Sequence, residues 1–289
     1  MTTYHTVKID DVDIFYREAG PSDAPLVVLL HGFPSSSHMY RNLLVELEGD
    51  FHLIAPDYPG FGNSACPPRD RFTYTFDHLS EVMEKFLQTL GIRKFTLYMQ
   101  DYGGPVGFRI AVRHPEWIES LIIQNANAYE EGLTPLMEQR RPFWEKRSRE
   151  AERVVLKTFT LVRTQWKYLN GVRDKNRISP DAWNMDQFFL DRPGNHLIQL
   201  ELQADYGSNV KQYPLWQSYL RKHQPPTLVV WGKNDEIFGP QGAEAYKRDV
   251  TNIEVHLLDT GHFALEEDGD VIAGHIRRFM QYLGLKKAA

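Results

Sequence analysis

The sequence predicts a doubly wound α/β fold, with a mostly parallel sheet and a helical cap inserted late in the chain. Short apolar runs alternate with helix-period segments at both ends of the chain, and this alternation is typical of parallel sheets built from βα units. The alternation stops over residues 130–224, where charged segments of helical period replace it. We therefore expect residues 1–129 and 225–289 to form the core, and residues 130–224 to form the cap, or lid.

The core elements follow from local patterns taken in chain order. Residues 7–17 alternate apolar and polar side chains, which indicates an antiparallel hairpin at a sheet edge. Continuous apolar runs bounded by turn residues predict buried strands, and these cover residues 26–30, 51–55, 95–100, 120–124, 227–232 and 254–258. Apolar stripes at helical spacing predict helices, and these cover residues 40–47, 76–90, 105–113 and 271–283.

Length and composition limit the possible classes of protein. A chain of 289 residues can bury a large core without a disulfide or a structural metal. A formal net charge of −5 argues against nucleic acid or an anionic membrane as a partner. Cys66 is the single cysteine, so no intramolecular disulfide can form, and a reducing compartment fits. No apolar run is long enough to span a bilayer and no secretory pattern is visible, so we expect a cytoplasmic protein.

The most informative stretch connects a predicted strand to a predicted helix. The apolar strand 95–100 ends at Asp101, and Tyr102, Gly103 and Gly104 lead into the next helix. One reactive residue at a sharp strand-to-helix turn is the pattern of a nucleophile elbow, here with aspartate where serine is common. A carboxylate is ionised at neutral pH and becomes a nucleophile without help from a base.

Two further polar residues follow later predicted strands. Asp235 comes after the strand 227–232, and His262 comes after the strand 254–258. Ligands of open α/β sheets bind beyond the carboxyl ends of the strands, and the chain order nucleophile, acid, histidine is that of a hydrolase triad. Acidic and histidine residues lack the spacing of metal ligands. We therefore expect a hydrolytic site that uses neither a metal nor another cofactor.

These motifs resemble those of the α/β-hydrolase superfamily, and specifically its aspartate-nucleophile branch of epoxide hydrolases and haloalkane dehalogenases. The resemblance extends over residues 26–283 and is weakest in the cap. It implies an α/β-hydrolase fold in which Asp101 attacks carbon and forms an alkyl ester. It also implies that His262, oriented by Asp235, activates the water that hydrolyses this ester.

The resemblance further implies an oxyanion hole at the end of the first parallel strand. Phe33, in the stretch His31-Gly-Phe-Pro34, and Tyr102 occupy the positions whose backbone N–H groups stabilise the oxyanion in this family. The family pattern also implies a cis peptide bond before Pro34.

The same resemblance leaves the reaction open. Epoxide hydrolases take the acid that opens the ring from cap tyrosines, and Tyr206 lies at a similar offset before the triad acid. The second donor is unassigned, with Tyr168 and Trp144 as candidates. Haloalkane dehalogenases typically hold the halide with Trp after the nucleophile and Asn after His-Gly, where this chain has Tyr102 and Phe33.

We expect epoxide hydrolysis first and haloalkane dehalogenation second. Fluoroacetate dehalogenases carry arginines near the elbow, where Tyr102 and Gly103 stand here, so that activity ranks third. A non-catalytic binder of small molecules, in which aspartate replaced a lost serine, is the alternative from a different class.

The composition of the cap suggests what the site accepts. Its aromatic residues could line an apolar pocket, which predicts a small, uncharged hydrophobic substrate, with water as co-substrate. These residues are Phe143, Trp144, Phe159, Trp166, Trp183, Phe188, Phe189 and Trp216. The run of arginine and glutamate over residues 138–153 predicts a solvated helix face.

Overall fold

The structure, a computed structural model, describes residues 1–285 and is built around a sheet of eight strands. The strand order is β1-β2-β4-β3-β5-β6-β7-β8; β1 and β2 are antiparallel, as are β2 and β4, and the other neighbouring pairs are parallel. The strands are β1 (Thr3–Ile9), β2 (Val12–Ala19), β3 (Leu26–Leu30), β4 (His52–Pro56), β5 (Phe95–Gln100), β6 (Ile118–Gln124), β7 (Thr227–Gly232) and β8 (Ile253–Leu258). The sequence-predicted fold class, a mostly parallel sheet with an antiparallel edge, is confirmed.

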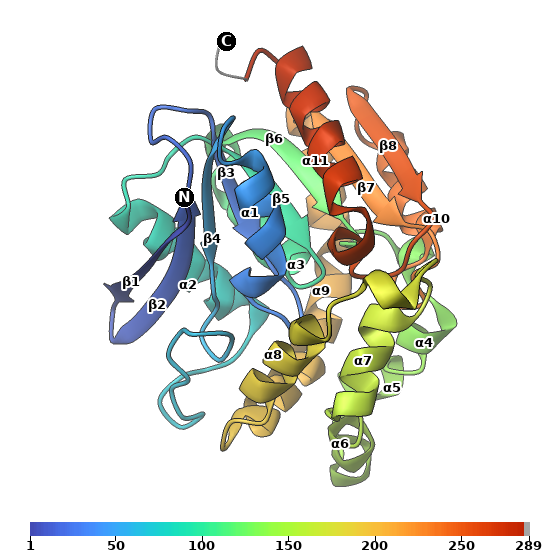
Figure 1. Cartoon of the computed structure of the whole chain (residues 1–289). Coiled ribbons are helices and arrows are strands. Elements are labelled where there is room, and N and C mark those ends of the chain that lie inside the picture. The colour runs from blue at the N-terminus through green and yellow to red at the C-terminus, as the bar shows by residue number, and fades with distance from the viewer. Residues whose placement is uncertain (286–289) are drawn as a thin grey trace.

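Helices cover both faces of this sheet (Figure 1). On one face α1 packs against α11, and on the other α2 packs against α3. The helices and 3₁₀ turns of the core are η1 (Ser37–Tyr40), α1 (Arg41–Leu47), α2 (Phe76–Thr89), α3 (Gly103–Arg113), η2 (Pro115–Trp117), α10 (Pro240–Ala245), η5 (Tyr246–Arg248) and α11 (Ala264–Tyr282). The last helix begins earlier than the apolar stripe at 271–283 predicts, because its first part continues across a kink at Asp268, where φ is −119° and ψ is 30°.

A set of helices lies between β6 and β7 in the chain, beyond the carboxyl ends of the parallel strands (Figure 1). They are η3 (Glu130–Gly132), α4 (Pro135–Glu138), α5 (Arg141–Glu145), α6 (Arg149–Leu156), α7 (Leu161–Leu169), η4 (Lys175–Arg177), α8 (Pro180–Leu190) and α9 (Asn195–His223). This is the segment for which the sequence predicts a cap, and we keep that name for residues 130–224.

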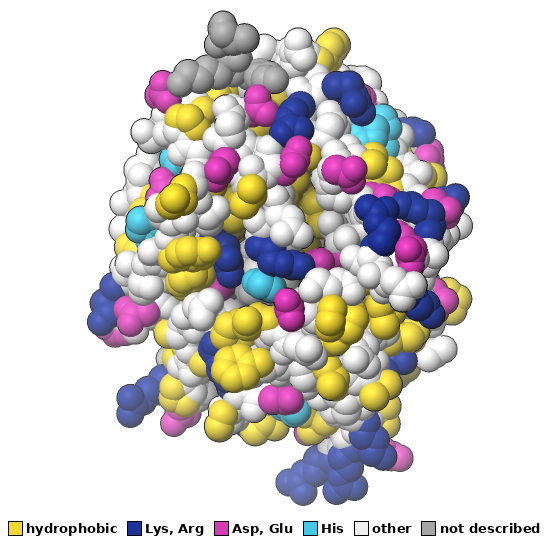
Figure 2. Space-filling view, viewed as in Figure 1, with side chains coloured by type: hydrophobic (Ala, Val, Ile, Leu, Met, Phe, Trp, Pro, Cys, Tyr) yellow, Lys and Arg dark blue, Asp and Glu magenta, His cyan; other side chains and the backbone are white. Residues whose placement is uncertain are grey.

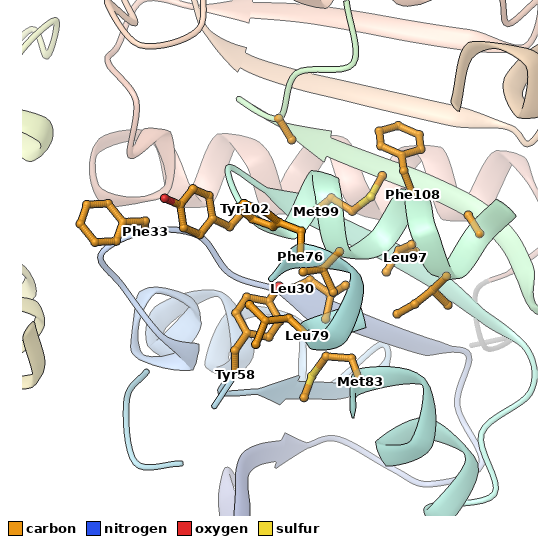
Figure 3. Packing of buried hydrophobic residues seen from close by; sticks show 14 of the residues in the cluster. Leu30, Phe33, Tyr58, Phe76, Leu79, Met83, Leu97, Met99, Tyr102 and Phe108 are labelled. Carbon is orange, nitrogen blue, oxygen red and sulfur yellow. The ribbon is translucent and has the colours of Figure 1, made fainter. Parts of the chain in front are cut away.

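The two faces of the sheet pack into separate apolar clusters. Alternate residues of a strand point to opposite faces, so Val28 and Leu30 of β3 join one cluster while Val27 and Leu29 join the other. Figure 3 shows part of the first cluster, in which the rings of Phe33 and Tyr102 lie side by side at the edge of the packed core. The core therefore extends up to the strand ends and fixes the residues that follow them.

The exposed surface carries charges of both signs. Acidic and basic side chains are interspersed over the face in Figure 2, with basic side chains gathered at the end of the cap near α6. Within residues 1–285, no helix combines the length and the apolar character that crossing a bilayer requires.

Candidate active site

Asp101 occupies a sharp turn between β5 and α3. Its φ of +48° lies in the left-handed region, which is unfavourable for a residue with a side chain and is often found at functional turns. The turn is possible because its neighbours lack side chains: a Cβ on Gly103 would lie 2.1 Å from the Leu30 carbonyl oxygen, and one on Gly32 would lie 2.2 Å from Cβ of Asp101. The packing of β5 and α3 thus places the carboxylate at the strand end.

Two backbone N–H groups donate hydrogen bonds to this carboxylate. The N–H of Phe33 donates to Asp101 Oδ1 at 2.7 Å, and the N–H of Tyr102 donates to the same side chain. The Phe33–Pro34 peptide bond is cis, as the family resemblance implies. The structure therefore brings both expected oxyanion donors to the candidate nucleophile.

His262 lies between the two acidic residues. Its Nδ1 is 2.7 Å from Asp235 Oδ2, and its Nε2 is 3.6 Å from Asp101 Oδ2. All three residues are buried. With Nδ1–H donating to Asp235, Nε2 carries the lone pair that can accept a proton, and it accepts a hydrogen bond from the Gln100 amide nitrogen, 3.2 Å away.

Asp235, the expected triad acid, is itself held in place by neighbours. Asn125 donates to Asp235 Oδ2 at 2.8 Å, and the N–H of Ile237 donates to Oδ1 at 2.7 Å. Asn125 directly follows β6 and has a φ of +41°. Sequence reasoning missed this amide, although its position at a strand end was visible.

The charge states of the three residues depend on one another. Burial raises the pKa of Asp101 above its ordinary value, while His262 and the Phe33 N–H oppose the rise. Burial alone would lower the pKa of His262, but the neighbouring carboxylates of Asp235 and Asp101 raise it above its ordinary value. Both shifts follow the rule that burial disfavours a charge and an opposite charge nearby favours it.

Asp101 lines a pocket between the core and the cap. About 530 Å³ of the pocket is not filled by protein atoms, and part of this space is open to solvent. Its apolar lining comes from Phe33, Leu136, Met137, Trp166, Ile237 and Phe238. Gln203 also lines it, and donates to the Tyr102 hydroxyl at 2.7 Å; sequence reasoning missed this residue.

The predicted cap residues reach different places. Tyr206 lines the pocket, with its ring centroid 6.2 Å from that of Tyr102. Trp144 packs against Tyr206, with centroids 4.9 Å apart, but is not among the described residues that line the pocket. Tyr168 does not line it either: its hydroxyl donates to Asp186 at 2.5 Å, and its ring stacks on Phe263 at 4.0 Å. The structure thus places Tyr206 in the pocket that Asp101 lines and leaves Tyr168 outside it.

Three basic residues of the cap also line the pocket: Arg140, Arg163 and Lys167. Burial lowers the pKa of the Lys167 ammonium to about 7, against the attraction of Asp101. The sequence predicts a solvated face over residues 138–153, and Arg140 departs from that prediction because it lines the pocket. A usable signal was present in α7, where Arg163 and Lys167 stand four residues apart and so share one helix face.

The fold and the site define the class of protein. A sheet of this topology, with an acidic residue at the elbow and a paired acid and histidine after later strands, is the arrangement of an α/β-hydrolase. A family model described as alpha/beta hydrolase fold matches residues 25–269. The chain therefore belongs to the α/β-hydrolase family and is a hydrolase of that family.

Individual relatives agree with this assignment. The chain is 43% identical to an uncharacterized hydrolase of Saccharomyces cerevisiae, over 94% of this chain and 95% of the relative. It is 35% identical to a haloalkane dehalogenase of Mycobacterium marinum, over 90% of this chain and 86% of the relative. Its fold is similar to that of the epoxide hydrolase CorEH, with a TM-score of 0.79, 21% identity, and coverage of 98% of this chain and 100% of the other.

Proposed function

We propose that this protein hydrolyses epoxides to diols through an alkyl ester on Asp101. The observation that carries the proposal is the presence of Tyr206 in the pocket that Asp101 lines. Burial raises the pKa of Tyr206 well above its ordinary value, so its hydroxyl stays protonated at neutral pH. Such a hydroxyl gives up its proton only to a strongly basic oxygen, such as the alkoxide formed when an epoxide opens.

In the first step, Asp101 attacks a ring carbon of the epoxide. Oδ1 is bound to the Phe33 N–H, which leaves Oδ2 as the attacking atom. A new C–O bond forms, the ring C–O bond breaks, and the departing oxygen takes a proton from Tyr206. The product is a β-hydroxyalkyl ester of Asp101.

In the second step, water hydrolyses this ester. His262 takes a proton from the water, and the carboxylate of Asp235, 2.7 Å from Nδ1, stabilises the imidazolium that forms. The hydroxide attacks the ester carbonyl carbon, and the N–H groups of Phe33 and Tyr102 stabilise the oxyanion. The alkoxide of the diol leaves with the proton from His262. The carboxylic acid left on Asp101 gives its proton back to the Tyr206 phenolate, which restores both residues.

Haloalkane dehalogenation is the second candidate, and the identity to the Mycobacterium marinum dehalogenase favours it. It would use the same Asp101, His262 and Asp235. The departing halide would need N–H or O–H donors, and Phe33 and Tyr102 supply side chains without the usual Asn amide and Trp indole. We therefore rank this reaction below epoxide opening.

Trapping the ester distinguishes these reactions. His262→Gln blocks the second step, so intact-mass measurement after exposure to an epoxide should find an adduct equal to the whole epoxide. An alkyl adduct from a bromoalkane, with bromide released, would instead support dehalogenation. The double variant Asp101→Ala, His262→Gln is the control and should form no adduct. If neither panel labels His262→Gln, the proposal of an alkyl ester fails and non-catalytic binding gains support.

A further inference from the structure

The pocket contains more positive charge than the proposed reaction requires. Arg140, Arg163 and Lys167 line it, and Asp101 is the one carboxylate among its described lining residues. Three cations facing one carboxylate give a net charge of +2 when all are ionised. Charges withdrawn from water are costly unless they are paired, so this excess calls for a counter-ion from outside the chain.

The three cations contact neutral groups rather than carboxylates within the described part of the chain. Arg163 lies over the Trp166 ring at 4.7 Å, and Lys167 Nζ lies 3.9 Å from the Phe33 ring centroid. Arg140 donates to the Thr158 hydroxyl at 3.4 Å. Its other terminal nitrogen, Nη1, is buried and has no hydrogen-bond partner in residues 1–285.

Neighbouring arginines of the cap behave differently. Arg141 pairs with Glu130 and Glu138, and Arg147 pairs with Glu152 and Glu201. The cap therefore pairs some of its basic residues with glutamates, whereas the three that line the pocket have no such partner in the part of the chain that the structure describes, although each is partly buried. This distribution points to a ligand rather than to a general excess of basic residues.

We propose that Arg140, Arg163 and Lys167 form a site for an anionic group on the substrate. Resting on the proposed epoxide reaction, this makes the substrate an epoxide that carries a carboxylate or a phosphate. Guanidinium groups match the paired oxygens of both anions. The apolar lining then holds the carbon skeleton rather than the whole of an uncharged molecule.

Two separate cap elements build this anion site. Arg163 and Lys167 project from one face of α7, and Arg140 lies between α4 and α5. Asp101 enters from the core and repels an anion. The anionic group is therefore bound on the cap side of the pocket, and the epoxide ring faces Asp101.

The first test compares matched pairs of epoxides. We expect kcat/KM at least about 10-fold higher for glycidate than for glycidamide, or for glycidol phosphate than for glycidol. The first pair tests recognition of a carboxylate, and the second pair tests recognition of a phosphate. Arg140→Gln and Arg163→Gln should each reduce the anion-to-neutral ratio of kcat/KM, in the pair that the wild type discriminates, by about 10-fold or more. Arg153→Gln, at an exposed position of α6, is the matched control and should keep the wild-type ratio.

The second test measures binding without any reaction. Cyclopropanecarboxylate and cyclopropanecarboxamide have the shape of the glycidyl pair but no epoxide oxygen, and their affinities can be measured by ligand-observed NMR. The wild type should bind the carboxylate more tightly by about 10-fold, and Arg140→Gln should lose that difference. Inorganic phosphate, as a competitor, is the corresponding probe for the phosphate arm.

The outcomes separate the two proposals. Equal affinities for acid and amide, with anion-to-neutral ratios unchanged in both arginine variants, would overturn the anion site and leave epoxide hydrolysis intact. Selective binding of an anion that both arginine variants lose, without turnover of any epoxide, would overturn the epoxide reaction and retain the anion site. Two separate arginine variants keep the test decisive if one of them fails to fold.

Discussion

At the scale of single residues, the two oxygens of Asp101 have different surroundings. Oδ1 accepts the Phe33 N–H at 2.7 Å, and Oδ2 lies 3.6 Å from His262 Nε2. The N–H groups that hold the free carboxylate are therefore the groups that would later stabilise the ester oxyanion. No rearrangement of the backbone is needed between the two proposed steps.

Tyr206 is the residue whose proposed role is most directly testable. Tyr206→Phe should lower the rate of epoxide turnover by at least about 10-fold, equivalent to about 1.4 kcal/mol of barrier, because the departing oxygen loses its proton donor. Rapid-quench measurement of ester formation should place the loss in the first step.

A second tyrosine of α9 provides the control for this prediction. Tyr219 is buried, its hydroxyl has no hydrogen-bond partner among the described residues, and it does not line the pocket. Tyr219→Phe should therefore leave the rate of ester formation unchanged. Equal rates in Tyr206→Phe and wild type would remove Tyr206 from the reaction.

At the scale of elements, the elbow depends on how closely α3 approaches β3. The approach is set by Gly103, because a Cβ there would lie 2.1 Å from the Leu30 carbonyl oxygen. A backbone atom cannot move aside as the end of a flexible side chain can. The helix and the strand would have to separate, which would move Asp101 away from the Phe33 N–H.

Gly103→Ala should accordingly lower the free energy of unfolding by about 2 kcal/mol or more. The same variant should also lose ester formation. Urea unfolding measures the first effect. Gly274→Ala in α11 is the control, because the nearest atom its Cβ would meet is Arg278 Nη1 at 3.6 Å. It should leave the free energy of unfolding unchanged or raise it by up to about 1 kcal/mol. A Gly103→Ala protein as stable as wild type would contradict the close-packed elbow.

At the scale of the whole molecule, the cap and the core meet around a buried carboxyl group. Asp186 of α8 accepts the Tyr168 hydroxyl at 2.5 Å, and the Tyr168 ring stacks on Phe263 of the core. Burial raises the pKa of Asp186 to about 7. The native state therefore retains this proton at pH values where the unfolded chain has lost it.

This shift predicts how stability depends on pH. Because the folded pKa is raised, the contribution of Asp186 to stability falls as pH rises from about 4 to about 7. Asp186→Asn removes the titrating group and keeps an acceptor for Tyr168. Urea unfolding measures the difference in free energy of unfolding between the variant and the wild type. This difference should be about 2–3 kcal/mol more favourable to the variant at pH 8 than at pH 5. Asp181→Asn, at an exposed position of the same helix, is the control for the substitution itself. An equal effect of Asp186→Asn on the free energy of unfolding at both pH values would contradict the prediction.

Most of the fold and the inner part of the site could be predicted from the sequence because their signals are local. Strand periodicity located β3 at residues 26–30 and β7 at 227–232 as the structure has them. Asp101, Asp235 and His262 each follow a predicted strand, and parallel strands end at one edge of a sheet. Their spatial convergence therefore follows from the chain order of the strands.

The cap residues could not be placed by the same reasoning. Tyr168 and Lys167 are adjacent in α7, yet one faces Asp186 and the other lines the pocket. Neighbouring residues of a helix point about 100° apart, so the rotation of the helix on the core decides which one reaches the substrate. The charged run over residues 138–153 likewise gave no means of separating Arg140 from its solvated neighbours.

The sequence by itself determined the sheet, the elbow with its aspartate and the order of the candidate triad, because each is encoded in short-range periodicity and turn chemistry. Only the tertiary structure decided the character of the pocket. Arg140, Arg163 and Lys167 meet there through the packing of separate cap helices against the core. That packing depends on contacts between segments far apart in the chain, for which local sequence patterns carry no signal.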